Sequence, residues 1–404
     1  MPEWTLYGQK LDLEEFKKNH PGGDLAILLG EERDCTRLFE QYHCRNASNQ
    51  TVLKQLAAQQ GKEIDPTIKD PFQQEVSQMA YDHKGGYTVS RSKIIMLFIF
   101  GAILITCWIG WAKGSWVACL LLPFINWVFG VNITHDGAHF AFSDIPWLND
   151  FLTIFSCPLG YNATVWYLEH NVSHHTRTNE VGHDIDMHLS EPLVRSHKSA
   201  PWSFLNAFQD ITCAILNFTF AVITQTIIFP LRLLFKCEKE KHFFGNYDAL
   251  LKRSIPKIII QYVIIAIFIT LPFIFFKWPK AIAFVLIPSV LTSIILMTIT
   301  QVSHIQEEVQ PEKPNESWMR QMVETSMDYS QDSLFWTFAT GGLNIQSLHH
   351  CIPAVESSHY IELYPKFRAI CEKHGVKIHE VPTLWDGIKK YWLHIRNLTK
   401  EPVI

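Results

Sequence analysis

The sequence predicts a mainly α-helical protein that crosses a membrane several times and begins with a soluble region. Hydrophobic residues make up 48% of its 404 residues and charged residues only 18%, and the charges become scarce in several long apolar runs. Such runs can cross a bilayer as helices, which takes roughly 20 apolar residues. Residues 1–90 are polar and contain no such run. The composition excludes a disordered chain, and the net charge of −4 predicts that nucleic acid is not a partner.

Three segments are expected in order along the chain. Residues 1–60 are predicted to form a small soluble domain, and residues 61–92 a polar linker with a short helix, because this stretch contains Asp-Pro and Gly-Gly pairs. Residues 93–404 form the predicted membrane domain. Its four expected spans are residues 94–112, 116–131, 258–276 and 281–300.

Two weaker apolar runs complicate the count of spans. Residues 151–166 and 211–234 contain proline and polar residues, so we expect them not to span the membrane and either to lie in its interface or to re-enter it. The start of the chain lacks the apolar core of a signal peptide, so internal segments must direct the protein to the membrane. The nine cysteines form no Cys-x-x-Cys pair, which predicts a reducing, cytosol-facing environment for the soluble parts.

Histidines gather at the predicted boundaries between membrane and water. Eight of the 19 histidines lie in three short motifs or directly after the fourth expected span. If they serve one site, an even number of crossings must separate the clusters, and four spans satisfy this. Eight imidazoles exceed what one tetrahedral zinc can use and suit two first-row metals such as iron. The predicted ligands are His135, His139, His170, His174, His175, His304, His349 and His350.

Helical periodicity predicts which rings face one another. The two histidines of the first motif are four residues apart and share a face of a helix. The same spacing pairs His170 with His174 and turns His175 about 100° away. Gln346 precedes the third pair by three and four residues, so its amide can face the same point.

The three motifs are His-Asp-Gly-Ala-His, His-Asn-Val-Ser-His-His and Gln-Ser-Leu-His-His. In this order they resemble the three histidine boxes of membrane fatty acyl desaturases, and the glutamine that opens the third box resembles the front-end branch. The resemblance implies four transmembrane helices with a cytosolic helical cap, and two non-haem iron ions held by the eight histidines. His304 matches the family's additional histidine after the fourth span, and Gln346 is expected to contact iron directly or through water.

Three polar residues near the boxes are further candidates for the site. Asp136, Asn344 and Asp186 are candidates to orient ligand rings through hydrogen bonds. His183 and His188 lie outside the matched boxes and are predicted to be solvated loop residues.

A second pair of histidines stands in the soluble region. His20 opens the turn His-Pro-Gly-Gly, and His43 follows 23 residues later; two histidines from opposite walls of an apolar pocket can ligate both faces of a haem iron. This pattern resembles a cytochrome b5 domain, a small α+β fold, and implies haem b bound by His20 and His43. The chain starts almost at the first matching segment, so we expect a shortened form of that domain.

Together the resemblances imply O₂-dependent front-end desaturation of an unsaturated fatty acyl chain, with electrons arriving through the cytochrome b5-like domain. The implied partners are a fatty acyl lipid or acyl-CoA, O₂, an NADH-cytochrome b5 reductase and the bilayer. The implied location is the endoplasmic reticulum, with the soluble parts facing the cytosol. Two alternatives stay open. One is a desaturase or hydroxylase of sphingolipid long-chain bases with the same site, and the other a non-catalytic membrane haem protein that relays electrons.

Overall fold

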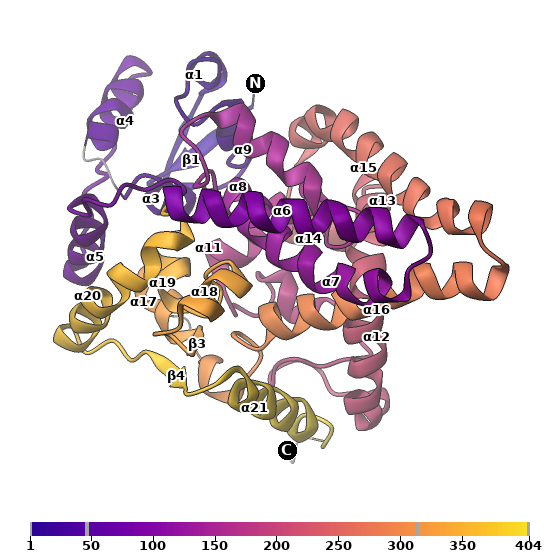
Figure 1. Cartoon of the computed structure of the whole chain (residues 1–404). Coiled ribbons are helices and arrows are strands. Elements are labelled where there is room, and N and C mark those ends of the chain that lie inside the picture. The colour runs from indigo at the N-terminus through magenta and orange to yellow at the C-terminus, as the bar shows by residue number, and fades with distance from the viewer. Residues whose placement is uncertain (1, 45–47, 312, 314, 402–404) are drawn as a thin grey trace.

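The computed structural model describes the chain except residues 1, 45–47, 312, 314 and 402–404. It is mainly helical, with a small N-terminal unit beside a bundle of long helices and a C-terminal helical layer (Figure 1). The histidine motifs lie in the short helices and turns that connect these parts. The account below therefore follows the elements that position them.

The N-terminal unit combines one hairpin with short helices. Strands β1 and β2 pair antiparallel, with Trp4 opposite Leu11, and the turn between them places Tyr7 and Gly8 at positive φ as a two-residue hairpin loop requires. Trp4, Leu11 and Leu25 are buried in the core beneath this hairpin. The elements are β1 (Trp4–Leu6), β2 (Gln9–Leu11), α1 (Glu14–Lys17), α2 (Asp24–Leu28), α3 (Thr36–Tyr42) and α4 (Ser48–Gln59).

The linker contains one regular helix, α5 (Pro71–Tyr81). Asp70 caps it by accepting a hydrogen bond from the backbone N–H of Phe72, and Pro71 takes the first helical position, where a missing N–H costs nothing. Phe72 and Val76 are buried against the C-terminal layer. The expected linker thus contributes to the core of the protein.

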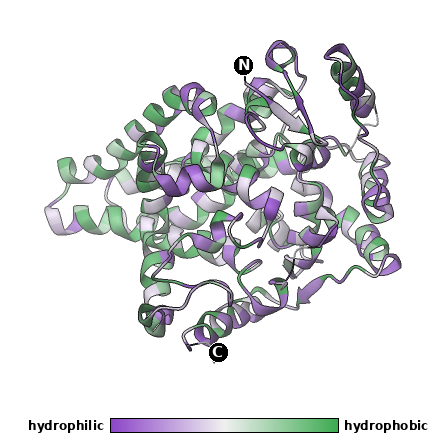
Figure 2. Cartoon of the chain, turned by 180° about the vertical axis from the view of Figure 1, so that it is seen from behind, coloured by the Kyte–Doolittle hydropathy of each residue, from purple (hydrophilic) through white to green (hydrophobic). Residues whose placement is uncertain are grey.

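Within the described residues, five helices are long and apolar enough to cross a membrane. Figure 2 shows hydrophobic residues concentrated along the long helices of the bundle, whereas the N-terminal and C-terminal parts are more hydrophilic. Many of these apolar side chains point outward, as a lipid-facing surface requires: Ile95, Phe98 and Ile99 on α6 are each at least half exposed. The candidates are α6 (Arg91–Ala112), Trp116–Ala138, which contains α7 (Trp116–Gly130), Phe204–Leu234, α15 (Asp248–Phe275) and α16 (Trp278–Gln301).

The expected count of four spans is therefore not confirmed. The second weak run lies in the candidate Phe204–Leu234, which is made of η5 (Phe204–Phe208), α12 (Gln209–Ile223), η6 (Thr224–Ile228) and α13 (Phe229–Leu234). In Figure 1, α12 runs across the direction of α6, α7 and α16. The first weak run, in contrast, forms only short pieces: α9 (Pro146–Leu152), η2 (Thr153–Ser156) and α10 (Ala163–Trp166).

The remaining elements connect and cap the bundle. Strands β3 and β4 pair in parallel, with Met327 opposite His379, and hold the C-terminal layer together. Between α7 and α15 lie η1 (Val131–His135), α8 (Asp136–Ala138), η3 (Tyr167–His174), α11 (His175–Arg177), η4 (Ile185–His188) and α14 (Glu238–Phe244). After α16 come η7 (Glu307–Val309), α17 (Trp318–Glu324), β3 (Met327–Tyr329), α18 (Leu334–Thr340), α19 (Gln346–Cys351), η8 (Ser357–His359), α20 (Tyr360–Lys373), β4 (His379–Val381) and α21 (Leu384–Asn397).

Candidate metal centre

The eight clustered histidines converge in the interior, although up to 215 positions separate them in the chain. None is more than 6% exposed. The rings come from the end of α7 and the turns after it, from η3 and α11, from the segment after α16, and from α19. In the described part of the chain, their nitrogen atoms form two neighbouring groups.

The first group contains four histidines whose ligand nitrogens lie within 4.8 Å of one another: His135, His139, His170 and His349. Nε2 of His170 is at its middle, 3.2 Å from Nε2 of His135 and 2.9 Å from Nε2 of His139. Nε2 of His175 is also 3.2 Å from Nε2 of His170, so this ring faces the same point. Nε2 of His349 is buried without a hydrogen-bond partner.

The second group consists of His174, His304 and His350. Nε2 of His174 and Nε2 of His304 are 3.3 Å apart. The side-chain amide of Gln346 lies between His304 and His350. Its nitrogen is 2.8 Å from Nε2 of His304 and 2.9 Å from Nε2 of His350. The glutamine that opens the third motif therefore occupies a position equivalent to that of a ring.

A change in helix type explains how the second motif serves both groups. Residues Tyr167–His174 form a π-helix, in which each turn holds one residue more than in an α-helix. His170 therefore shares its face with His175, five residues on, whereas His174 points to the second group. The rings of His170 and His174 stack with their centres 5.7 Å apart, as the α-helical spacing predicts, but His175, which that spacing turns away, also faces His170, with ring centres 4.5 Å apart. A second π-helical turn, η1, precedes the first motif.

The other ring nitrogen, Nδ1, has a hydrogen-bonding partner in five of these histidines. The partners are Tyr42 for His139 (2.8 Å), Asp184 for His174 (3.0 Å), the backbone oxygen of Thr325 for His304 (3.0 Å), Tyr360 for His349 (3.0 Å) and Thr178 for His350 (3.0 Å). Such bonds set the orientation of a metal-binding imidazole and leave Nε2 for the metal. Sequence reasoning missed all four side chains, because nothing in their local sequence shows that they reach a distant histidine.

The three predicted orienting residues have different surroundings. Asp186 lies 3.6 Å from Nδ1 of His174, behind the closer Asp184. Asp136 lies 3.8 Å from Nδ1 of His135 and bonds Lys93 instead. Asn344 bonds the backbone oxygen of Ser330 and the hydroxyl of Thr340, and among the described residues none of its side-chain hydrogen bonds goes to a ring of the centre.

The structure bears out only one of the two predictions for the loop histidines. His183 is exposed, as expected. The prediction that His188 is solvated is wrong: it lies in η4 with its side chain 13% exposed, its Nδ1 is 2.8 Å from Oε2 of Glu191, and its Nε2 accepts a 2.9 Å hydrogen bond from the backbone N–H of Gly182. Neither belongs to the groups described above.

Burial controls the charge of the clustered rings. Desolvation and the neighbouring rings lower the pKa of His170, His175, His349 and His350 well below the usual value, and burial lowers the pKa of His304 to about 3. These rings are therefore neutral, as metal binding requires. For His174, burial also disfavours the charged form, but the carboxylates of Asp184 and Asp186 raise the pKa above its usual value.

This donor set fits transition metals. Ligands about 2.1 Å from a metal stand roughly 3.0–3.4 Å apart when the geometry is octahedral or tetrahedral. The Nε2–Nε2 distances of 2.9–3.3 Å within the two groups agree with such an arrangement. Neutral imidazoles also suit iron.

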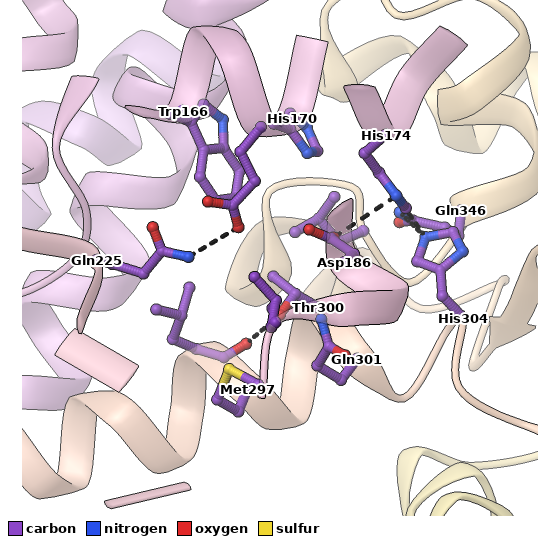
Figure 3. Close-up of a pocket in the computed structure, with 14 residues that line it drawn as sticks. Trp166, His170, His174, Asp186, Gln225, Met297, Thr300, Gln301, His304 and Gln346 are labelled. Atoms are coloured by element: carbon purple, nitrogen blue, oxygen red, sulfur yellow. Dashed lines mark hydrogen bonds and ion pairs between the residues drawn. The ribbon is translucent and has the colours of Figure 1, made fainter. Parts of the chain in front are cut away.

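A cavity opens beside the second group (Figure 3). Leu296, Met297 and Leu343 make part of its wall apolar, and His170, His174 and His304 line the side toward the histidines. Opposite them, the amide of Gln225 donates a 2.8 Å hydrogen bond to Glu169. The cavity thus offers an apolar surface next to the cluster of rings.

His20 and His43 face one another in the N-terminal unit. Their ring centres are 6.0 Å apart, close to the roughly 6 Å expected for imidazoles bonded to opposite faces of one metal about 2.0 Å away. Nδ1 of His20 lies 3.2 Å from the backbone oxygen of Gly23, and Nδ1 of His43 lies 2.8 Å from that of Phe39. Both bonds orient Nε2 as the nitrogen that could bind iron, so the pair fits a haem.

Apolar helices, buried histidine groups and an N-terminal histidine pair define a multi-pass membrane oxidoreductase with metal-binding sites. The family description "Fatty acid desaturase" matches residues 93–382, and "Cytochrome b5-like Heme/Steroid binding domain" matches residues 4–63. The chain belongs to the fatty acid desaturase family and has an N-terminal cytochrome b5 domain. This confirms the resemblance inferred from the histidine motifs.

Characterised relatives cover nearly the whole chain. An acyl-lipid omega-13 desaturase of Chlamydomonas reinhardtii is 33% identical, over 98% of this chain and 92% of that protein. An acyl-lipid (8-3)-desaturase of Mortierella alpina is 26% identical, over 98% of this chain and 94% of that protein. The acyl-lipid (8-3)-desaturase B of Dictyostelium discoideum is 25% identical, over 99% and 91%. The protein is thus a desaturase, an oxidoreductase that acts on fatty acyl chains with O₂.

Proposed function

We propose that this protein is a front-end desaturase that introduces a double bond into an unsaturated fatty acyl lipid at a centre of two iron ions. The observation that carries the proposal is the meeting of two groups of buried histidines beside one cavity whose wall is partly apolar. The names of the relatives support an acyl-lipid substrate. They differ in the position of the double bond, so that position is left to product analysis.

The two groups suggest how the ligands are divided. We assign His135, His139, His170, His175 and His349 to one iron and His174, His304 and His350 to the other. Gln346 contacts the second iron directly or through water. When bound, the iron pair supplies the O₂-derived oxidant that removes hydrogen from an unactivated methylene, a task that no side chain can perform.

The chain itself positions the substrate and the ligands. Leu296, Met297 and Leu343 present an apolar surface that favours an acyl chain over water. Asp184 orients His174 through its contact with Nδ1 of that ring. The methylene group that reacts is the one that this wall holds beside the rings.

Electrons are proposed to reach the centre through haem b, held by His20 and His43. The expected donor to this domain is an NADH-cytochrome b5 reductase. We place the domain at residues 1–60, the linker at 61–92 and the desaturase domain at 93–404, in agreement with the matched ranges 4–63 and 93–382.

The geometry of the centre favours four crossings of the membrane. Nε2 of His174 and Nε2 of His304 lie 3.3 Å apart, so an even number of crossings separates these residues. Since α15 and α16 account for two, a complete crossing by Phe204–Leu234 would place the rings on opposite faces. We therefore place this helical segment along the interface.

The exposed side chains of that segment support the interfacial position. Phe204, Phe208, Ile211 and Ile215 are exposed at spacings that follow one face of a helix. We further propose that the protein resides in the endoplasmic reticulum and that the centre and the cytochrome b5 domain face the cytosol.

The test is expression in a host with a simple lipid profile, fed with candidate unsaturated acids. We expect products two mass units lighter than the substrate fatty acyl chain, and two non-haem irons per chain in the purified protein. His174→Ala should abolish desaturation and leave the haem spectrum unchanged. Hydroxylated or long-chain-base products would contradict the proposed reaction or substrate, and haem without non-haem iron would indicate an electron carrier.

A further inference from the structure

The N-terminal domain reaches into the metal centre of the membrane domain. Tyr42 is the last residue of α3, and its hydroxyl lies 2.8 Å from Nδ1 of His139. The side-chain amide of Asn171, within the second histidine motif, donates a 2.9 Å hydrogen bond to the same hydroxyl oxygen. One phenol thus joins the first and second motifs, although it belongs to the domain that carries His20 and His43.

The membrane domain has a matching contact of its own. The hydroxyl of Tyr360, on α20, lies 3.0 Å from Nδ1 of His349. Two rings of the first group are therefore held in the same way by a phenol, one from each domain. This similarity indicates that the contact of Tyr42 belongs to the centre rather than to the packing of the haem domain.

Other residues of α3 hold this helix in place. The amide of Gln41, which is fully buried, donates a 2.6 Å bond to the backbone oxygen of His175. Arg37, one helical turn before it, donates to the backbone oxygen of Thr176 at 2.6 Å and forms a 2.7 Å ion pair with Glu180. These bonds fix the rotation and the height of α3, and so the position of the phenol.

We propose that α3 is a permanent part of the desaturase centre and that Tyr42 is a positioning residue for His139. The inference rests on the proposed metal-binding role of the first group. With Nε2 of His139 turned toward a metal, Nδ1 keeps its proton and donates it to the oxygen of Tyr42. Because His43 follows Tyr42 directly, one short segment joins the haem pocket to the metal centre.

The proposal gives the cytochrome b5 domain a second task. A domain that only delivers electrons could be replaced by a separate carrier, whereas a domain that supports a ligand is needed for the centre to bind metal. Partners of metal ligands in this position typically change metal affinity or activity by roughly 10–100-fold when they are removed.

The test uses the full-length protein with Tyr42→Phe, which keeps the ring and removes only the hydroxyl. We expect its iron affinity, measured by competition with a chelator, to fall by roughly 10-fold or more. The haem absorption spectrum should be unchanged, and the iron Mössbauer spectrum should differ from that of the unaltered protein. Tyr360→Phe serves as the comparison within the membrane domain and should have a similar effect.

Tyr7→Phe is the matched control. The hydroxyl of Tyr7 lies in the same domain and donates a 3.0 Å hydrogen bond to Glu40, which is not one of the described residues of the metal centre. Its loss should leave both the iron affinity and the Mössbauer spectrum unchanged. A Tyr42→Phe protein with the iron affinity and spectrum of the unaltered protein would overturn the proposal, provided that the unaltered protein binds iron.

A second variant tests the docking without touching a histidine partner. Arg37→Glu places a carboxylate against Glu180 and should displace α3, so iron affinity should fall while haem is retained. Arg37→Lys keeps the positive charge, so this variant should retain most of the iron affinity of the unaltered protein. Unchanged iron affinity in Arg37→Glu would also contradict the proposal. An unaltered protein that binds no iron would instead refute the proposed function on which the inference rests.

Discussion

Oδ2 of Asp184 lies 3.0 Å from Nδ1 of His174, ten residues earlier in the chain, and both side chains are buried. The same carboxylate is held by the backbone N–H groups of Asn179 and Asp186, at 2.9 and 3.0 Å. In the described residues, the other Nδ1 hydrogen bonds of the clustered histidines go to the neutral groups of Tyr42, Thr178, Tyr360 and the backbone of Thr325. The Nδ1 contact of His174 is thus with a negatively charged group, and this charge makes the ring a stronger electron donor to a metal at Nε2.

Asp184→Asn should weaken the second group of ligands. The amide keeps the shape of the side chain but removes the negative charge behind His174. We expect iron content or desaturation to fall by roughly 10–100-fold with haem unchanged. Metal analysis and lipid product analysis measure both effects. Asp144→Asn, at an exposed loop position, is the control, and equal activity of the two variants would show that the carboxylate has no such role.

Lys93→Met should destabilise the whole membrane domain. Lys93 is buried at the start of α6, where it pairs with Asp136 at 2.8 Å and also with Glu356, and so connects the first motif with the region after the third motif. Its removal leaves two buried carboxylates without a counter-charge, which typically costs about 3–5 kcal/mol. Thermal unfolding in detergent should show a clear loss. Lys113→Met, at the exposed end of the same helix, should unfold like the unaltered protein.

His20→Ala should remove haem and spare the non-haem iron. A haem with two histidine ligands loses one of them, whereas the residues around the iron site are untouched. The absorption band of the haem should disappear, and the iron content should stay at the level of the unaltered protein. His183→Ala changes an exposed histidine and should alter neither reading. Haem binding that survives His20→Ala would contradict the proposed ligand pair.

Met297→Trp should fill the cavity beside the histidines. Met297 is buried on α16 and lines the cavity wall, so a larger ring would occupy space that we assign to the acyl chain. We expect product formation to fall by at least about 10-fold while iron and haem contents are kept, because no ligand is changed. Met297→Leu, which conserves volume, is the control and should retain activity. Full activity of the tryptophan variant would place the substrate elsewhere.

Asp70 should make stability depend on pH at the acid end. Burial disfavours its charged form, but bonds from Arg320 and Ser317 lower the pKa of Asp70 below the usual value. A carboxylate with a lowered folded-state pKa adds stability above its unfolded pKa of about 3.9, and this stability is lost as the pH falls through the folded value.

Asp70→Asn should therefore cost about 1–3 kcal/mol at neutral pH, since Asn still caps α5 but loses the charged bonds. The difference between the variant and the unaltered protein should shrink as the pH falls below about 4. Thermal unfolding at a series of pH values measures it. A difference that stays constant down to the lowest pH would show that the ion pair is not the cause.

Much of this molecule could be predicted from local patterns. The apolar runs predicted membrane helices because a bilayer crossing needs an uninterrupted stretch of fixed length, and the histidine motifs predicted the family because their residue types are required by the chemistry. His20 and His43 predicted the cytochrome b5 domain in the same way. Each of these signals is a pattern of residue types along a continuous stretch of chain, which can be interpreted without knowledge of the fold.

The tertiary structure decided what depends on distant contacts. The π-helix at Tyr167–His174 assigned His170 and His174 to different groups, which α-helical spacing could not predict, because the wider turn is stabilised by its surroundings. The hydrogen-bond partners of His139 and His174, which are Tyr42 and Asp184, could be identified only from the three-dimensional structure. A hydrogen bond depends on the positions of two groups, and only the packing of the two domains brings the phenol of Tyr42 to within 2.8 Å of His139.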